Sequence, residues 1–122
     1  MEKIYYKNLN EAIERNKPKI ASTKKNLEDT GVKYVLSSWI DMHGIPKTKP
    51  VPMSDFEALC MGKGPQFAVH SVSFVPELTP ADPDQIMLPD LSAVYVCPWD
   101  KSQAIIFADL FWEGEPYNVD KL

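Results

Sequence analysis

Residues 32–51 read VKYVLSSWIDMHGIPKTKPV, and this stretch predicts two antiparallel strands joined by a tight turn. Apolar side chains fall on both alternating faces of residues 32–40, as in a strand with two partly apolar faces. Asp41 and Gly44 supply turn chemistry, an aspartate that bonds the backbone and a glycine that lets the chain reverse. Residues 45–51 form the return arm, and their prolines place that arm at the edge of a sheet.

Further strands are expected downstream of this hairpin. Residues 92–97 (SAVYVC) and 103–111 (QAIIFADLF) are the clearest, and residues 98–102 between them form a loop of hairpin length. Residues 67–74 alternate weakly and predict another strand. Residues 76–89 contain four prolines and three acidic residues, which predicts an ordered loop or a flap rather than a core element.

The first 30 residues are polar and lysine-rich, with apolar side chains near a helical repeat. Asn8 or Asn10 is the expected N-cap, and Gly31 ends the pattern as a C-terminal helix glycine does. Pro18 predicts a break, because proline removes a donor and clashes with the preceding turn. We therefore expect a short or frayed helix before Pro18 and a firmer one from Pro18 to Asp29.

A second, short helix is expected over residues 55–61, with Ser54 as its N-cap and Glu57 at the capping-box position. With 122 residues the chain has the size of one domain. One layer of strands with helices against it makes an α+β domain. We expect a mixed sheet of four to five strands with one or two packed helices and the N-terminal helix in front.

Composition excludes several classes of protein. No apolar run approaches the roughly 20 residues of a membrane span, and the N-terminus lacks a stretch of signal-peptide length, so the cytoplasm is the expected location. The net charge is −4 and no basic cluster follows an aromatic-rich surface, which argues against a nucleic-acid partner. Cys60 and Cys97 are expected to be free buried thiols, although one bridge between them is possible.

The residues by themselves show no complete catalytic motif. Glycine-rich phosphate loops, dinucleotide fingerprints and nucleophile elbows are all missing from the sequence. Asp41 and His43 look like a dyad, but a turn aspartate bonding the backbone is the better interpretation. Asp82, Asp84 and Asp90 lack the spacing of a calcium loop and are expected to cap loops. This pattern is typical of an accessory domain rather than of a complete enzyme.

An ordered series of short phrases resembles the glutamine synthetase family. Residues 32–35 (VKYV) and 39–47 (WIDMHGIPK) look like the family's opening strand, turn and return strand, which residues 49–52 (KPVP) continue. Residues 64–71 (GPQFAVHS) stand where the family carries Gly-x-x-Phe-Asp-Gly-Ser-Ser. The register is completed by residues 88–92 (LPDLS), 97–99 (CPW), 108–109 (AD) and 114–117 (GEPY). The resemblance covers about residues 32–117.

The resemblance implies the N-terminal β-grasp domain of a glutamine synthetase-like ligase. In that family a larger catalytic domain follows and binds ATP and Mg²⁺ (or Mn²⁺), and the active site lies between neighbouring subunits of a homo-oligomeric ring. On this reading, residues 1–31 are an N-terminal helical segment and residues 32–117 the β-grasp domain. Residues 118–122 then begin a linker to a catalytic domain outside this chain, and the chain by itself is expected to be inactive.

In the family, this segment lines the part of the active site that binds the amine, and this sequence differs from it there. Phe67 matches the family phenylalanine and Ser71 its second serine, whereas Ala68, Val69 and His70 replace its aspartate, glycine and first serine. The resemblance makes Phe67, Ala68, His70 and Ser71 candidate amine-site residues. A carboxylate concentrates ammonium and takes its proton, so its loss indicates a different amine, as in the γ-glutamylmethylamide synthetase-like branch. The alternative is that Ala68 only packs and another residue supplies the charge.

Two functions of different classes follow. The first is a domain of an ATP-dependent glutamate–amine ligase, using ammonia or methylamine, that forms the amine-side wall of an inter-subunit site. The second is a free-standing β-grasp protein-interaction module without catalytic activity. Under the first, the domain has an apolar surface for the catalytic domain of the neighbouring subunit. The candidates for that surface are Trp39, Trp99, Phe111 and Trp112.

Overall fold

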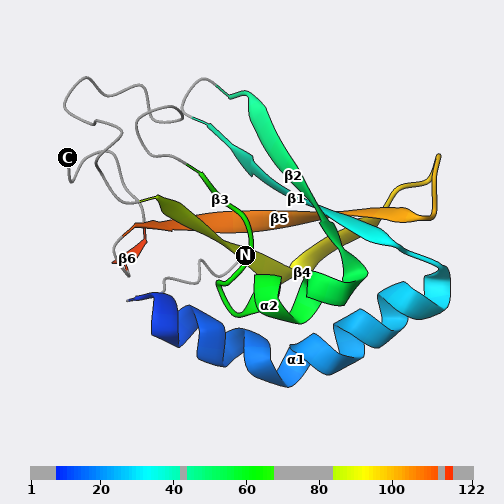
Figure 1. The fold of residues 1–122 in the computed structure, drawn as a ribbon, viewed down its shortest axis with the longest axis horizontal. Coiled ribbons are helices and arrows are strands. Elements are labelled where there is room, and N and C mark those ends of the chain that lie inside the picture. Colours follow the sequence, from blue (N-terminus) through cyan, green and yellow to red (C-terminus); the bar gives the residue numbers. More distant parts are fainter. Residues whose placement is uncertain (1–7, 42–43, 68–83, 113–114, 117–122) are drawn as a thin grey trace.

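The computed structural model describes residues 8–41, 44–67, 84–112 and 115–116. Figure 1 shows both helices on one side of a twisted sheet, with α2 between α1 and the strands. In chain order the elements are α1 (Leu9–Thr30), β1 (Tyr34–Ile40), β2 (Pro46–Pro52), the 3₁₀ helix η1 (Met53–Asp55), α2 (Phe56–Cys60), β3 (Gln66–Phe67), β4 (Gln85–Val96), β5 (Gln103–Trp112) and β6 (Glu115–Pro116).

The strands form one mixed sheet in the order β2-β1-β5-β4-β3, with β6 paired to β5. β1 and β5 run parallel, with Tyr34 opposite Gln103, and the other described pairs are antiparallel. This confirms the predicted α+β fold. The proline-rich return arm, β2, lies at an edge of the sheet as its sequence indicates.

The outer edge of β2 has few backbone donors. Met53 donates its backbone N–H to the carbonyl of Lys33 at 3.0 Å, so the odd-numbered backbone groups of β2 face β1. Because backbone groups alternate along a strand, the even-numbered groups face outward, and proline has no N–H to offer. The outward-facing positions are Pro46, Thr48, Pro50 and Pro52.

Helix α1 corrects the expectation of two helices, since it is continuous for 22 residues and Pro18 lies inside it. Proline in a helix interior costs roughly 3 kcal/mol. Ile20 and Leu27 of the same helix are buried in the main core, and each buried side chain contributes about 1.5–3 kcal/mol. Packing of the apolar stripe therefore outweighs the local cost of Pro18, which itself is exposed.

Both ends of α1 follow the sequence signals. Asn8, rather than Asn10, is the N-cap, and its side-chain oxygen accepts the backbone N–H of Glu11 at 2.9 Å. Gly31 ends the helix at φ 96°, in the left-handed region that glycine adopts without strain. Among the described residues, no helix has the length and apolarity needed to cross a membrane.

The main core lies between the helices and the sheet. Phe56 and Leu59 of α2 are fully buried against Val35 of β1 and Ile106 of β5. Cys60 belongs to the same core, and burial, followed by the nearby charge of Glu57, raises the pKa of its thiol to about 12. Both cysteines are free and buried, as expected.

The second helix, α2, lies within the expected residues 55–61, but its predicted cap does not form. Ser54 lies inside η1, and no side-chain hydrogen bond caps η1 or α2, so the predicted capping box is wrong. Met53 and Phe56 explain the difference, because both are buried and residues three apart lie on one side of a 3₁₀ turn. Burial of these two side chains in the core, rather than a capping hydrogen bond, stabilises the start of the helical segment.

Strand β4 begins earlier than expected, because residues 85–89 are strand rather than loop. The pairing of β4 with β5 shifts register between Pro89 and Val94, and such irregularities accommodate proline. Residues 68–74 of the predicted strand and residues 76–83 of the predicted loop lie outside the described residues. β6 has no counterpart in the sequence prediction.

Candidate functional site

The candidate amine-site residues follow the last residue of β3. The backbone of Phe67 pairs with Gln85 of β4, whereas Ala68, His70 and Ser71 lie outside the described residues. Strand directions bring the ends of β1, β3 and β5 to the edge where β4 begins. We name this the carboxyl edge of the sheet; Figure 1 shows it on the left of the molecule.

The turn after β1 buries a carboxylate at the carboxyl edge. One oxygen of Asp41, Oδ1, accepts the backbone N–H of Ile45 at 2.9 Å, and its backbone carbonyl accepts the N–H of Gly44 at 3.0 Å. The other oxygen, Oδ2, lies 3.6 Å from Nζ of Lys47. A buried carboxylate needs such partners because desolvation of an isolated charge is costly. The turn interpretation of Asp41 is confirmed, and His43 lies outside the described residues.

A second lysine of β2 reaches across the fold to β3. Nζ of Lys49 donates a hydrogen bond to the backbone carbonyl of Gln66. Lys47, Lys49 and the buried Val51 alternate on the helix-bearing face of β2. In a flat sheet, β2 and β3 would lie four strand spacings apart, roughly 19 Å. The contact therefore requires a curled sheet, as Figure 1 shows.

Other buried polar side chains share this face near the carboxyl edge. Ser37 and Gln85 are fully buried, and Trp39 is 8% exposed. The Ser37 hydroxyl lies 3.6 Å from the sulfur of Met87, and Trp39 and Met87 share a small apolar cluster. Lys47, Lys49 and Gln85 were not among the residues predicted from the sequence. The sequence pattern that could have identified them is weak, because it consists only of polar residues that alternate in register with a buried apolar residue of the same strand.

The chain enters β3 through a tightly held loop. The backbone N–H of Gly62 donates to the carbonyl of Leu59 at 3.1 Å, and that of Lys63 donates to the carbonyl of Ala58 at 2.9 Å. Gly62 has φ 76°, which favours glycine. At Gly64, an added Cβ would lie 2.7 Å from Cδ1 of Leu59 and 3.2 Å from its Cα. The loop thus packs directly on α2.

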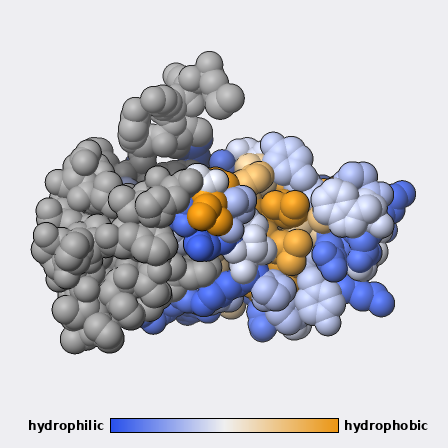
Figure 2. Space-filling model, turned by 90° about the horizontal axis from the view of Figure 1, so that it is seen from above, coloured by the Kyte–Doolittle hydropathy of each residue, from blue (hydrophilic) through white to orange (hydrophobic). Residues whose placement is uncertain are grey.

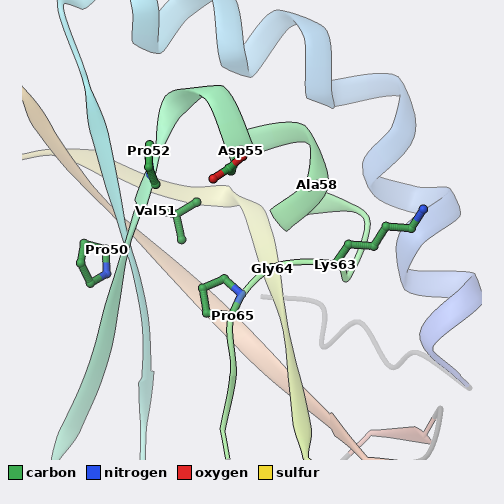
Figure 3. Close-up of a pocket in the computed structure, with 8 residues that line it drawn as sticks. All are labelled: Pro50, Val51, Pro52, Asp55, Ala58, Lys63, Gly64 and Pro65. Atoms are coloured by element: carbon green, nitrogen blue, oxygen red, sulfur yellow. The ribbon is translucent and has the colours of Figure 1, made fainter.

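A groove of about 430 Å³ separates this loop from the end of β2. Figure 3 shows prolines on both sides, with Pro50 on β2 and Pro65 before β3, while Lys63 points away toward α1. Its lining residues are Pro50, Val51, Pro52, Asp55, Ala58, Lys63, Gly64 and Pro65. The shared groove confirms that β2 and the approach to β3 lie close together.

Gly64→Ala is expected to lower the free energy of unfolding by about 1–3 kcal/mol, because overpacking forces neighbouring atoms to move. Leu59 is fully buried and cannot turn away into solvent. Denaturant unfolding of the variant and the wild type measures the effect. The control is Lys63→Ala, at the exposed neighbouring residue. Equal stability of the two variants would contradict the close contact between Gly64 and α2.

The face of the sheet turned away from α1 is partly apolar, as Figure 2 shows. Tyr34, Tyr95 and Phe107 are exposed on it, and the rings of Tyr95 and Phe107 meet edge to face with centroids 6.2 Å apart. These three residues define the aromatic face. Trp39 and Phe111, by contrast, are buried, because their side chains pack into apolar clusters within the domain. Their expected place on an exposed apolar surface is therefore wrong.

Trp99 is 76% exposed at the tip of the hairpin between β4 and β5, as expected. The tip is held by Asp100, whose Oδ1 accepts the backbone N–H of Ser102 at 3.0 Å and its hydroxyl at 2.6 Å. These hydrogen bonds lower the pKa of Asp100. The turn therefore presents Trp99 to solvent from an ordered backbone.

Of the aspartates considered as cation ligands, Asp90 lies in β4, within its register shift, rather than in a loop. Oδ1 of Asp90 accepts both the backbone N–H and the hydroxyl of Ser92, so its carboxylate holds local backbone as expected, but within a strand and not in the expected loop. Desolvation, followed by the charge of Asp90, raises the pKa of Asp109. Asp84 is exposed, and Asp82 lies outside the described residues. Within the described part of the chain, His, Cys, Asp and Glu side chains form no group of three able to hold a metal ion.

Known proteins resemble the chain in both sequence and fold, although no family model matches it. Glutamine synthetase of Rhizobium meliloti (strain 1021) is 39% identical over 88 residues, covering 72% of this chain and 20% of that protein. Glutamate–methylamine ligase of Methyloversatilis universalis is 31% identical over 96 residues, covering 77% of this chain and 21% of that protein. The chain thus spans about a fifth of the length of these curated relatives.

Solved structures share the fold as well. The structure named "GmaS/ADP complex-Conformation 1" superposes with a TM-score of 0.70 at 26% identity, covering 78% of this chain and 21% of that one. The structure named "Apo GmaS without ligand" gives a TM-score of 0.69 at the same identity, covering 77% of this chain and 22% of that one. The likeness again spans most of this chain and about a fifth of the larger proteins.

Proposed function

Because the chain belongs to the glutamine synthetase family, we propose that it is the N-terminal domain of a glutamate–amine ligase. Its carboxyl edge forms the amine-side wall of an active site completed by a neighbouring subunit. The observation that supports this most is the combined match to a glutamine synthetase and a glutamate–methylamine ligase. The competing function, a free-standing interaction module, is not favoured, because these relatives are ligases.

The proposal divides the reaction between two domains. ATP and Mg²⁺ or Mn²⁺ bind to a catalytic domain outside this chain, where they activate the side-chain carboxylate of glutamate for attack by the amine. The described residues do not fit the metal, since they bring no three suitable ligands together. In this proposal, nucleotide and metal are bound by the catalytic domain, and the contribution of this chain lies on the amine side.

On the amine side, Phe67, Ala68, His70 and Ser71 are the residues proposed to line the wall. Asp41, the buried carboxylate at the same edge, already contacts the N–H of Ile45 and the ammonium of Lys47. Ala68 therefore leaves the wall without the carboxylate that the family segment carries. A methyl group buried there gains roughly 0.8 kcal/mol, which favours methylamine over ammonia.

The aromatic face is the proposed contact surface for the neighbouring catalytic domain in a homo-oligomeric ring. Exposed aromatic side chains gathered on one face are typical of protein interfaces. Tyr34, Tyr95 and Phe107 supply that surface here. The proposal includes a cytoplasmic location, because free thiols such as Cys60 and Cys97 are usual in a reducing compartment.

The test is phosphate release by the complete protein, assayed with ATP, Mg²⁺ and glutamate while the amine is varied among ammonia, methylamine and ethylamine. We expect release that depends on both glutamate and an amine, with formation of the corresponding γ-glutamyl amide. The isolated 122-residue chain serves as the inactive control. A complete, folded protein that releases no phosphate with any of the three amines would contradict the proposed function.

A further inference from the structure

We propose that Lys49 is a positioning residue for amine selection, acting through the backbone of β3 rather than on the amine itself. Its ammonium group holds the carbonyl of Gln66, one residue before Phe67. The inference rests on the proposed function, since it concerns the same amine-side wall. It adds a residue that the family segment 64–71 does not contain.

The first support is that β3 is too short to hold itself in place. It has two residues, which pair with Ile86 and Gln85 of β4. Two strand pairs contribute little by comparison with the seven that join β1 to β2. The Lys49 contact is charge-assisted and adds a third point of attachment to the two strand pairs of β3.

The second support is that β3 is held from both sides. Its approach packs on α2 through Gly64, which leaves no room for a Cβ beside Leu59. Lys49 reaches β3 from the opposite edge of the sheet, across the curled face. The chain is thus fixed by α2 just before Gln66 and by β2 at Gln66 itself, immediately ahead of the proposed wall.

The third support is that the two inward lysines of β2 have different partners. Lys47 lies 3.6 Å from Asp41 and stabilises the turn after β1. Lys49 lies two residues further along the same face and bonds β3. Because Lys47 is engaged at the turn, it does not substitute for Lys49 at Gln66.

The experiment compares Lys49→Met, Lys49→Arg and Lys101→Met in the complete protein. Methionine keeps the apolar stem and removes the charge, arginine keeps a cationic donor, and Lys101 is exposed in the hairpin between β4 and β5. Misplacement of a positioning group by about 1 Å costs up to roughly 100-fold. We expect Lys49→Met to raise the amine KM about 10-fold or more while the KM values for glutamate and ATP stay within about twofold.

A second readout measures the position of β3 directly. Hydrogen–deuterium exchange over residues 62–71 is expected to become faster in Lys49→Met, and to stay at the wild-type rate in Lys101→Met. Lys49→Arg is expected to restore both the exchange rate and the amine KM. An unchanged exchange rate, or faster exchange with an unchanged amine KM, would overturn the role of Lys49.

Failure of this inference is separable from failure of the proposed function. If Lys49→Met changes nothing while the wild-type protein still forms γ-glutamyl amides, the positioning role is wrong and the ligase assignment stands. If the wild-type protein forms no amide, the proposed function itself has failed. Equal increases in the KM values for amine, glutamate and ATP would indicate general destabilisation and would also overturn the inference.

Discussion

In the complete protein, acting as the proposed ligase, Ala68→Asp is expected to shift the ratio of kcat/KM values toward ammonia and away from methylamine by roughly 10–200-fold. A carboxylate a few ångströms from the nitrogen favours a small cation that donates several hydrogen bonds. The larger, polar side chain also occupies space in which a methyl group would pack. Both effects act on the same ratio and in the same direction.

The measurement is competition between amines with glutamate and ATP saturating. Ser71→Ala is the matched comparison, because its hydroxyl would serve the nitrogen that every amine shares. It is expected to weaken ammonia, methylamine and ethylamine together and leave their ratio unchanged. If Ala68→Asp stays active with the wild-type ratio, Ala68 only packs and another residue sets the amine.

Asn16→Ala is expected to lower the free energy of unfolding by about 2–4 kcal/mol, because it leaves two buried carbonyls without a donor. Nδ2 of Asn16 donates to the carbonyl of Cys60 at 3.3 Å and to that of Pro89 at 3.1 Å. Cys60 is the last residue of α2, and Pro89 begins the register shift in β4. At a helix end and at a register shift, backbone carbonyls find few regular hydrogen-bond donors. The side-chain amide of Asn16 supplies donors to both carbonyls.

Denaturant unfolding of the variant against the wild type measures this effect. Asn26→Ala, at an exposed site on the same helix, is the control and is expected to stay within about 0.5 kcal/mol of the wild type. Asn16→Asp should destabilise at least as much as Asn16→Ala, because a carboxylate offers these carbonyls no hydrogen. If Asn16→Ala were as stable as Asn26→Ala, the bridge would contribute nothing measurable.

Local signals predicted most of the fold. The turn chemistry of Asp41 and Gly44 gave the hairpin, Asn8 and Gly31 marked the ends of α1, and the prolines of residues 45–51 indicated an edge strand. Each of these depends on backbone chemistry within a few residues. Such signals can be interpreted from the sequence because they do not depend on contacts with distant parts of the chain.

The predictions at Pro18, Pro89 and Ser54 were wrong because the structure there depends on distant parts of the chain. A proline usually breaks a helix or strand, yet α1 continues through Pro18 because its apolar stripe is buried. Pro89 is accommodated by a register shift that depends on β5. Ser54 loses its expected cap role because Met53 and Phe56 turn inward together. In each case tertiary packing outweighs a local preference.

The candidate site was only partly predictable. Phe67, identified from the motif and expected to begin a strand, lies at the end of β3. Asp41 was correctly predicted to be a turn residue. The contact between Lys49 and Gln66 depends on curling of a sheet whose strand order places their strands at opposite ends. No pattern within either segment reports that curvature, so the sequence alone does not indicate this contact.

The outer edge of β2 constrains how copies of this domain come together in an assembly. The proposed ring would bring identical strands close together, and identical edges are natural templates for intermolecular hydrogen-bonded ladders, the route to fibrils. Of its outward positions, Pro46, Pro50 and Pro52 offer no donor, which leaves Thr48. Each copy offers a single outward N–H, so two such edges form at most two backbone hydrogen bonds, whereas a continuous ladder needs several. Association is thereby directed to side-chain surfaces, whose shape admits few orientations, and away from open-ended polymerisation.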